Sequence, residues 1–241
     1  MYDFDKLTDR SGTLSYKWDV EPGELPMWVA DMDLEAPPAV TEAIQRRAAH
    51  GIYGYSTTPE ELFSAVSDYW CRRHGFRFPT EWMVYSNGVV AALSSMVRRL
   101  TCPGENVLIQ APVYNIFYNS ILNNGRRVLS SDLVFTGEGY SVDFADLEEK
   151  LSHPQTTLMI LCNPHNPVGR IWSREELARI GALCSKHGVT VISDEIHCDL
   201  TAPGTGYTPF ASVDGICASV SVSCLAASKY PKIIYLKLSS I

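Results

Sequence analysis

Long apolar runs are missing from this sequence. No stretch approaches the ~20 consecutive apolar residues that a membrane-spanning helix requires. The first residues, MYDFDKLTDRSG, are polar and charged and do not resemble a signal peptide. We therefore expect a cytoplasmic protein with no membrane partner.

An excess of basic residues is also missing. The chain has 20 Lys and Arg residues against 27 Asp and Glu residues, which gives a formal net charge of −7. Proteins that bind nucleic acids usually present a basic face, so this balance argues against a nucleic-acid partner.

Paired metal-ligand motifs are absent as well. The seven cysteines are an odd number and include no Cys-x-x-Cys, and the six histidines include no His-x-x-x-His. These patterns predict small buried thiols in a reducing compartment and no metal site.

The composition that is present suits a globular protein, with 46% hydrophobic and 20% charged residues in 241. Helical patterns end at Gly51 and Gly75, and capping boxes are predicted at Thr58 with Glu61, beside Pro59, and at Ser173 with Glu176. Between the helical patterns lie short apolar runs, which we predict to be strands: WMVYSNG, ENVLIQAP, TTLMILCNP, VTVISDE and ASVSVSCLA.

This alternation predicts an α/β fold with a doubly wound, mostly parallel sheet and helices on both faces. In such sheets ligands bind beyond the carboxyl ends of the strands, so the residues that follow each strand are the candidates for a site.

Two of these strand ends lead directly into helices. Asn87-Gly88 precedes a helix that starts at about Val89, and the free N–H groups of a helix start favour a phosphate. The alternative is an ordinary glycine turn. Tyr114 opens the next helix, where its ring is placed either to stack on a flat ligand or to fill the core.

Two other strand ends carry polar groups. The loop LCNPHNPVGR holds two Asn-Pro pairs, and its amides are placed either to hydrogen-bond a ligand or to shape the loop. Asp194 follows the apolar run Val189–Ile192, where a carboxylate needs a cationic partner or acts as a helix cap. Lys229 comes after a further strand, either as part of this set or as a surface lysine.

The order of these features resembles the pyridoxal-phosphate enzymes of the aspartate-aminotransferase fold. The strings MWVADMD, GIYGYS, APVYNIFYNSI, NPHNPVGR and SDEIHCDL are most similar to the MalY/PatB-type cystathionine and cysteine-S-conjugate β-lyases, over residues 2 to about 229. The resemblance implies that Lys229 holds the cofactor covalently and removes the substrate Cα proton. It implies further contacts to the cofactor from Asp194 at the ring nitrogen, Asn166 and His197 at the ring hydroxyl, Tyr114 on the ring face, Gly88, Val89 and Val90 at the phosphate, and Ser228 beside Lys229.

The resemblance also implies a homodimer, in which Tyr55 reaches the phosphate of the partner's cofactor, and a substrate border at Ala30 and Asp31. The implied reaction cleaves a small sulfur amino acid to pyruvate, ammonia and a thiol. Aminotransferases share the fold and nearly all of the cofactor residues, so amino-group transfer is the first alternative.

The resemblance stops abruptly after Ser228 and Lys229, and the remaining sequence is YPKIIYLKLSSI. We therefore expect an N-terminal segment at 1–44, an incomplete cofactor-binding domain at 45–229 and an unrelated tail at 230–241. The C-terminal small domain, and with it the arginine for the substrate carboxylate, is expected to be missing, through a frameshift, a retained intron or a wrongly assigned gene end. A non-catalytic remnant is the second alternative. The stretch KIIYLKLSSI is β-prone and is predicted to add as an edge strand.

Overall fold

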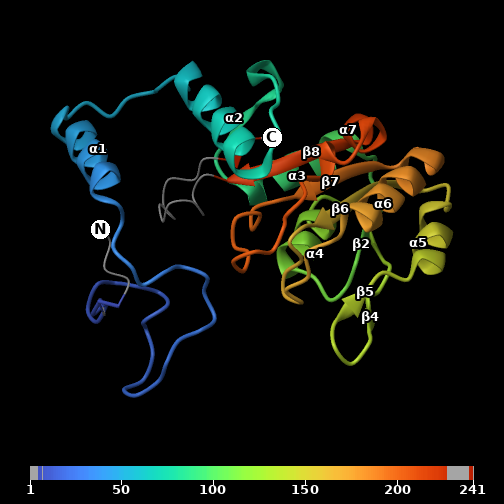
Figure 1. Cartoon of the computed structure of the whole chain (residues 1–241), viewed down its shortest axis with the longest axis horizontal. Coiled ribbons are helices and arrows are strands. Elements are labelled where there is room, and N and C mark those ends of the chain that lie inside the picture. The colour runs from blue at the N-terminus through green and yellow to red at the C-terminus, as the bar shows by residue number, and fades with distance from the viewer. Residues whose placement is uncertain (1–4, 7, 227–238, 241) are drawn as a thin grey trace. The chain divides into compact units, whose positions relative to one another are not determined.

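The structure is a computed structural model that describes residues 5, 6, 8–226, 239 and 240 (Figure 1). Its helices are α1 (Pro38–Ala49), α2 (Glu60–His74), α3 (Val89–Leu100), α4 (Asn115–Leu122), α5 (Phe144–Leu151), α6 (Arg174–His187) and α7 (Gly215–Val220), with short 3₁₀ turns η1 (Thr80–Trp82) and η2 (Phe210–Ser212). Its strands are β1 (Tyr85–Ser86), β2 (Asn106–Ile109), β3 (Arg127–Ser130), β4 (Val134–Phe135), β5 (Tyr140–Ser141), β6 (Thr156–Cys162), β7 (Thr190–Asp194), β8 (Ser221–Ala226) and β9 (Ser239–Ser240).

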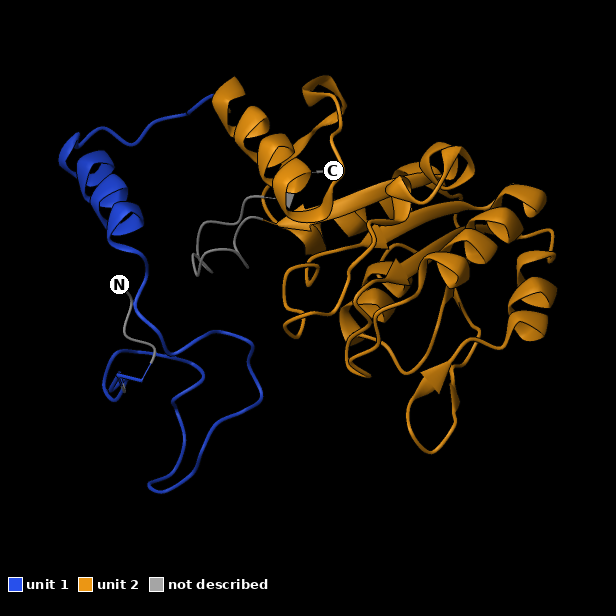
Figure 2. Ribbon diagram, in the orientation of Figure 1, with its two compact units in different colours: residues 1–57, 227–236 blue, residues 58–226, 237–241 orange. Residues whose placement is uncertain are grey.

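The chain divides into two compact units (Figure 2). One comprises residues 1–57 and 227–236, and the other residues 58–226 and 237–241. The larger unit contains a seven-stranded sheet in the order β1-β9-β8-β7-β6-β2-β3. Strands β8, β7, β6, β2 and β3 are mutually parallel, whereas β9 runs antiparallel to both of its neighbours.

Alternate residues of the central strands pack into two separate hydrophobic clusters. Val107, Leu158 and Ile192 face one cluster, which α3 and α4 cover. Leu108, Met159 and Val191 face the other, which α5, α6 and α7 cover. Because successive side chains of a strand point to opposite faces, this division requires helices on both sides of the sheet. The predicted fold class is therefore confirmed.

The helix boundaries agree with the predicted caps at one site and disagree at another. Ser173 caps α6, with its hydroxyl accepting from the Glu176 N–H at 3.2 Å and Glu176 accepting from the Ser173 N–H at 2.8 Å. The capping box predicted at Thr58 is wrong. Pro59 has an extended backbone (φ −73°, ψ 144°) and is itself the N-cap, so α2 begins at Glu60 and Thr58 lies one residue too early.

Two strand predictions also need correction. The run ASVSVSCLA is not one strand, because Asp214 accepts from the Cys217 N–H at 2.8 Å and caps α7, which occupies the first part of the run. Only Ser221–Ala226 is strand. Of the C-terminal stretch KIIYLKLSSI only Ser239 and Ser240 are described; they form β9, which lies between β8 and β1 and not at an edge of the sheet.

The smaller unit contains α1, which has no buried residue, and an ion-pair network. Arg10 lies 2.6 Å from Asp31 and 2.8 Å from Asp33, and Lys17 lies 2.7 Å from Asp33. Burial raises the pKa of Asp33, but hydrogen bonds from Lys17, Trp18 and Arg10 outweigh it and bring the pKa to about 2. These paired charges hold the irregular segment around residues 10–33 together.

Candidate functional site

The connections after β1, β2, β6 and β7 all leave the sheet at the same edge. Strands β2, β6, β7 and β8 are parallel, and β1 is parallel to β8 because each pairs antiparallel with β9. The carboxyl ends of these strands therefore meet at one edge. Asp194 ends β7, and Gly88, Tyr114 and Asn166 follow the ends of β1, β2 and β6, so all four lie along that edge, as the strand pattern predicts.

Asp194 is the last residue of β7 and is only 4% exposed. It lies two residues beyond Ile192, so its side chain is on the face of the sheet that α3 and α4 cover. Its Oδ1 accepts from the Ile196 N–H at 3.2 Å. In register, Asp194 lies between Cys162 of β6 and Cys224 of β8. Burial first, and then the charge of Asp194, raise the pKa of both thiols, so they remain protonated neighbours of the carboxylate.

Asn166 lies in the loop that follows β6. Its backbone N–H donates to Cys162 Sγ at 3.4 Å. Because Cys162 is the register partner of Asp194, this bond places the backbone of Asn166 close to the end of β7. The loop is closed by the Gly169 N–H, which donates to the His165 carbonyl at 2.8 Å. The two neighbouring strand ends thus bring an amide and a carboxylate to one part of the edge.

His165 positions this loop, a role that the sequence alone did not reveal. Its Nε2–H donates to the Pro112 carbonyl at 3.0 Å, and its ring packs edge-on against Trp172. Burial lowers the pKa of His165, which keeps the imidazole neutral. Because Pro112 is two residues before Tyr114, this bond ties the Asn-Pro loop to the segment that leads into α4. A histidine between two Asn-Pro pairs was the available signal.

The start of α3 supplies backbone donors. Gly88 is the N-cap with φ 121° and ψ 152°, a conformation that only glycine adopts readily. The N–H groups of Val89 and Val90 lie in the first turn, where a helix provides no acceptor of its own. Val89 is buried against the sheet and Val90 is about half exposed. This geometry suits an anion.

Tyr114 is the N-cap residue of α4 and is 39% exposed. Its ring packs edge-on against Phe117, with the ring centroids 6.0 Å apart. Burial raises the pKa of the Tyr114 hydroxyl, and the negative charge of Asp194 raises it further. Tyr114 opens α4 and Asp194 ends β7, so an aromatic ring and a carboxylate lie along the same edge of the sheet.

Glu195 is a second buried carboxyl, whose contacts no local sequence pattern predicts. It is fully buried, and its Oε1 accepts from Ser193 Oγ at 2.8 Å, from the Phe210 N–H at 3.0 Å and from Ser223 Oγ at 3.3 Å. Burial raises the pKa of Glu195 despite these hydrogen bonds. Its bond to Phe210 places it on the opposite face of the sheet from Asp194.

The remaining predicted site residues are distributed differently. His197 lies in the turn directly after β7, three residues from Asp194. Tyr55, Ala30 and Asp31 belong to the smaller unit, where Tyr55 is fully exposed and Asp31 pairs with Arg10. Ser228 and Lys229 lie outside the described residues.

A doubly wound sheet with a carboxylate, an amide, an aromatic ring and a helix start along its carboxyl edge is the setting of a cofactor enzyme. The family model of aminotransferase class I and II matches residues 26–236. The chain belongs to this family.

Individual relatives agree with the family model. The chain is 50% identical to the cystathionine beta-lyase PatB of Bacillus subtilis over 245 residues, which cover 99% of the chain. Among solved structures, cystalysin from Treponema denticola, which contains a pyridoxal 5′-phosphate cofactor, matches with a TM-score of 0.94 at 33% identity and 100% coverage of the chain. The PLP-bound C-S lyase from Staphylococcus hominis matches with a TM-score of 0.90 at 34% identity over 100% of the chain.

The chain is shorter than these relatives. It spans 63% of the Bacillus protein, 63% of the Treponema chain and 62% of the Staphylococcus chain. Within the described residues, no helix is both long enough and apolar enough to cross a membrane.

Proposed function

We propose that the chain carries the cofactor-binding part of a pyridoxal-phosphate-dependent carbon–sulfur β-lyase. The observation that carries the proposal is the buried Asp194 carboxylate at the end of β7, on the edge of the sheet where Tyr114 opens α4 and Gly88 caps α3. A flat cationic ring with an anionic arm fits these groups. The carboxylate suits a protonated ring nitrogen, the aromatic ring suits a ring face, and the bare N–H groups of α3 suit a phosphate.

Each residue then has a chemical task. Asp194 would accept the hydrogen of the ring nitrogen and keep that nitrogen protonated, while Cys162 and Cys224 would stay neutral and add no competing charge. Asn166 would donate its amide hydrogen to the ring hydroxyl, with His197 as a second residue for that oxygen. Lys229 would bind the cofactor and remove the substrate Cα proton, and Ser228 precedes it in the sequence. When bound, the cofactor would supply the electron sink for the reaction.

The substrate class follows from the lyase relatives. We propose cystathionine or another cysteine S-conjugate, in which the bond from Cβ to sulfur breaks, one water is consumed, and a thiol, pyruvate and ammonia are released. Ala30 and Asp31 border the substrate in this proposal. The chain spans only 63% of the Bacillus relative. That a chain of this length turns over substrate is therefore itself part of the proposal.

The assembly and location are proposed on the same basis. We propose a homodimer in which Tyr55 of one protomer reaches the cofactor phosphate bound by the other, and a cytoplasmic protein. We also retain the division into an N-terminal segment at 1–44, a cofactor-binding domain at 45–229 and a distinct tail at 230–241. Cross-linking the purified chain, with Tyr55→Phe as the comparison, tests the dimer.

The first test is the near-visible absorbance of the purified chain with added pyridoxal phosphate. We expect a bound-cofactor band in the wild type and in Lys232→Ala, a matched lysine control three residues away, and no such band in Lys229→Ala. The same band in all three proteins would contradict the role of Lys229.

The second test separates lyase from transferase chemistry. Cystathionine should give pyruvate with the wild type and none with Lys229→Ala. If the substrate instead converts the cofactor to stable pyridoxamine phosphate, which a keto acid then restores, the reaction is amino-group transfer and the lyase proposal fails.

A further inference from the structure

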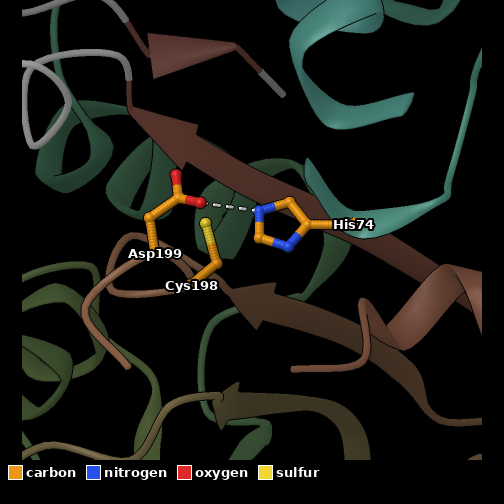
Figure 3. A group of neighbouring side chains, drawn as sticks. All are labelled: His74, Cys198 and Asp199. Atoms are coloured by element: carbon orange, nitrogen blue, oxygen red, sulfur yellow. Dashed lines mark ion pairs between the residues drawn. The ribbon is translucent and has the colours of Figure 1, made fainter. Parts of the chain in front are cut away.

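Three side chains with metal-binding atoms converge outside the proposed cofactor site. His74 is the last residue of α2, and Cys198 and Asp199 lie in the turn after β7. Their ligand atoms all lie within 4.8 Å of one another (Figure 3). The side chains of His74 and Asp199 are 4% and 3% exposed, and Cys198 is 6% exposed.

The histidine presents a nitrogen to this group. His74 Nε2 lies 2.9 Å from Asp199 Oδ1, so the imidazole and the carboxylate form a close, buried pair inside this group. The imidazole is held in place by edge-on contacts to Trp70 at 4.9 Å and Tyr207 at 5.2 Å. A fixed ring whose buried nitrogen faces a carboxylate and a thiol presents that nitrogen as a metal ligand.

The thiol and the carboxylate complete a mixed donor set. Cys198 contributes a buried sulfur and Asp199 a buried carboxylate oxygen to the group. Arg73 Nε lies 3.3 Å from Asp199 Oδ1, the same oxygen that pairs with His74, and helps to fix the orientation of the carboxylate.

We propose that His74, Cys198 and Asp199 form a binding site for a divalent transition-metal ion, with Zn²⁺ as the preferred class. One imidazole nitrogen, one sulfur and one carboxylate oxygen are the three donor types that zinc takes in proteins, and they leave the fourth tetrahedral position for water. Binding replaces the thiol proton, so one Zn²⁺ enters and one proton leaves. The thiolate and carboxylate together balance the charge of the ion.

The site has a structural consequence. His74 ends α2, whereas Cys198 and Asp199 belong to the turn that carries His197 and follows Asp194. A bound ion therefore joins α2 to that turn, and it stabilises the native chain because the ligand set is not assembled in the unfolded chain.

The test uses the untagged chain, without added pyridoxal phosphate, in a Cys71→Ser, Cys102→Ser background. This background removes the two cysteines that are not buried. With Co²⁺ we expect one equivalent bound and a thiolate-to-metal absorption band in the near ultraviolet. With Zn²⁺ we expect release of about one proton, measured by calorimetry in two buffers, and a higher unfolding temperature.

Cys198→Ser should abolish the Co²⁺ band and weaken Zn²⁺ binding by at least about tenfold, since even an outer partner of a ligand is worth about 10–100-fold. Cys184→Ser, which removes a buried thiol elsewhere, should leave both unchanged. Asp199→Asn provides a second variant if Cys198→Ser does not fold. Three results would overturn the proposal: no metal binding by the parent chain, a Co²⁺ band that persists in Cys198→Ser, or equal Zn²⁺ affinity in the parent chain and Cys198→Ser.

Discussion

At the scale of single residues, two adjacent carboxyl groups have opposite surroundings. Asp194 lies on the α3 side of the sheet beside Tyr114, and Glu195 lies on the α6 side among Ser193, Ser223 and the Phe210 N–H. Because adjacent residues point to opposite faces, the chain places two carboxyl groups in different surroundings at consecutive positions.

Glu195 makes the stability of the chain depend on pH. Its pKa is raised in the folded state above the ordinary 4.5, so its contribution is fully present below pH 4.5 and is lost as pH rises through the folded pKa. Glu195→Gln should remove this loss. The wild type should therefore lose stability relative to the variant above pH 4.5, by at most about 1.4 kcal/mol per pH unit.

Urea unfolding of both proteins between pH 4.5 and 8 measures this difference, and the other ionisable groups cancel in the comparison. A difference that stays constant over the whole range would mean that Glu195 ionises equally in the folded and unfolded chains.

At the scale of helices and strands, the turn between β1 and α3 depends on Gly88. A side chain at φ 121° is strained, so Gly88→Ala should destabilise the chain by about 1–3 kcal/mol. It should also weaken the binding of pyridoxal phosphate, because the first N–H groups of α3 shift. Gly139→Ala is the control, since its Cβ would meet no atom within 4 Å and its backbone is not in the positive-φ region. Chemical unfolding and a cofactor titration measure the two effects, and equal losses in both variants would contradict the prediction.

The capping box of α6 gives a second prediction at this scale. Ser173→Ala leaves the Glu176 N–H without its acceptor and should cost about 1 kcal/mol of unfolding free energy. Ser185→Ala, an exposed position within the same helix, should be neutral or slightly stabilising because alanine favours helices. Thermal unfolding of the two variants compares them, and a neutral Ser173→Ala would show that the cap contributes nothing.

The elements differ in how far the sequence predicted them. Ser173 and Glu176 could be recognised because a capping box is a local pattern, and the apolar run of β6 could be recognised because both faces of that strand are covered. The capping box predicted at Thr58 was wrong because Pro59 itself takes the N-cap position of α2. The run ASVSVSCLA was predicted as one strand because its valines favour strands. Its first residues are instead helical, because the hydrogen bond from the Cys217 N–H to Asp214 caps α7.

At the scale of the whole molecule, contacts between distant segments were beyond prediction. The edge that gathers Gly88, Tyr114, Asn166 and Asp194 could be predicted, since parallel strands bring their carboxyl ends together. The approach of His74 to Asp199 could not, because no spacing rule links the end of α2 to the turn after β7. The hydrogen bond from Ser223 to Glu195 likewise joins β8 to the residue that follows β7.

The connection between the two compact units is the place where proteases should act first. Residues 51–59 form no helix or strand, and Tyr53 and Tyr55 are 71% and 111% exposed. Limited chymotrypsin treatment should cut after these tyrosines and release a fragment that begins at Gly54 or Ser56. Mass spectrometry identifies the fragment, and the Tyr53→Ser, Tyr55→Ser double variant should lose it. A first cut within residues 60–226 would contradict the prediction.

The interior position of β6 and β7 also decides how these segments exchange hydrogen with solvent. Each strand is paired on both sides, and each is covered on both faces. Amide hydrogens in the middle of these strands should therefore exchange with deuterium only when the whole larger unit opens, whereas α1, with no buried residue, should exchange through local fraying. Asp194 and the Asn-Pro loop begin where these strands end. The polar edge is thus attached to the slowest-exchanging backbone of the larger unit, so its geometry should persist through the local openings that expose the rest of the chain.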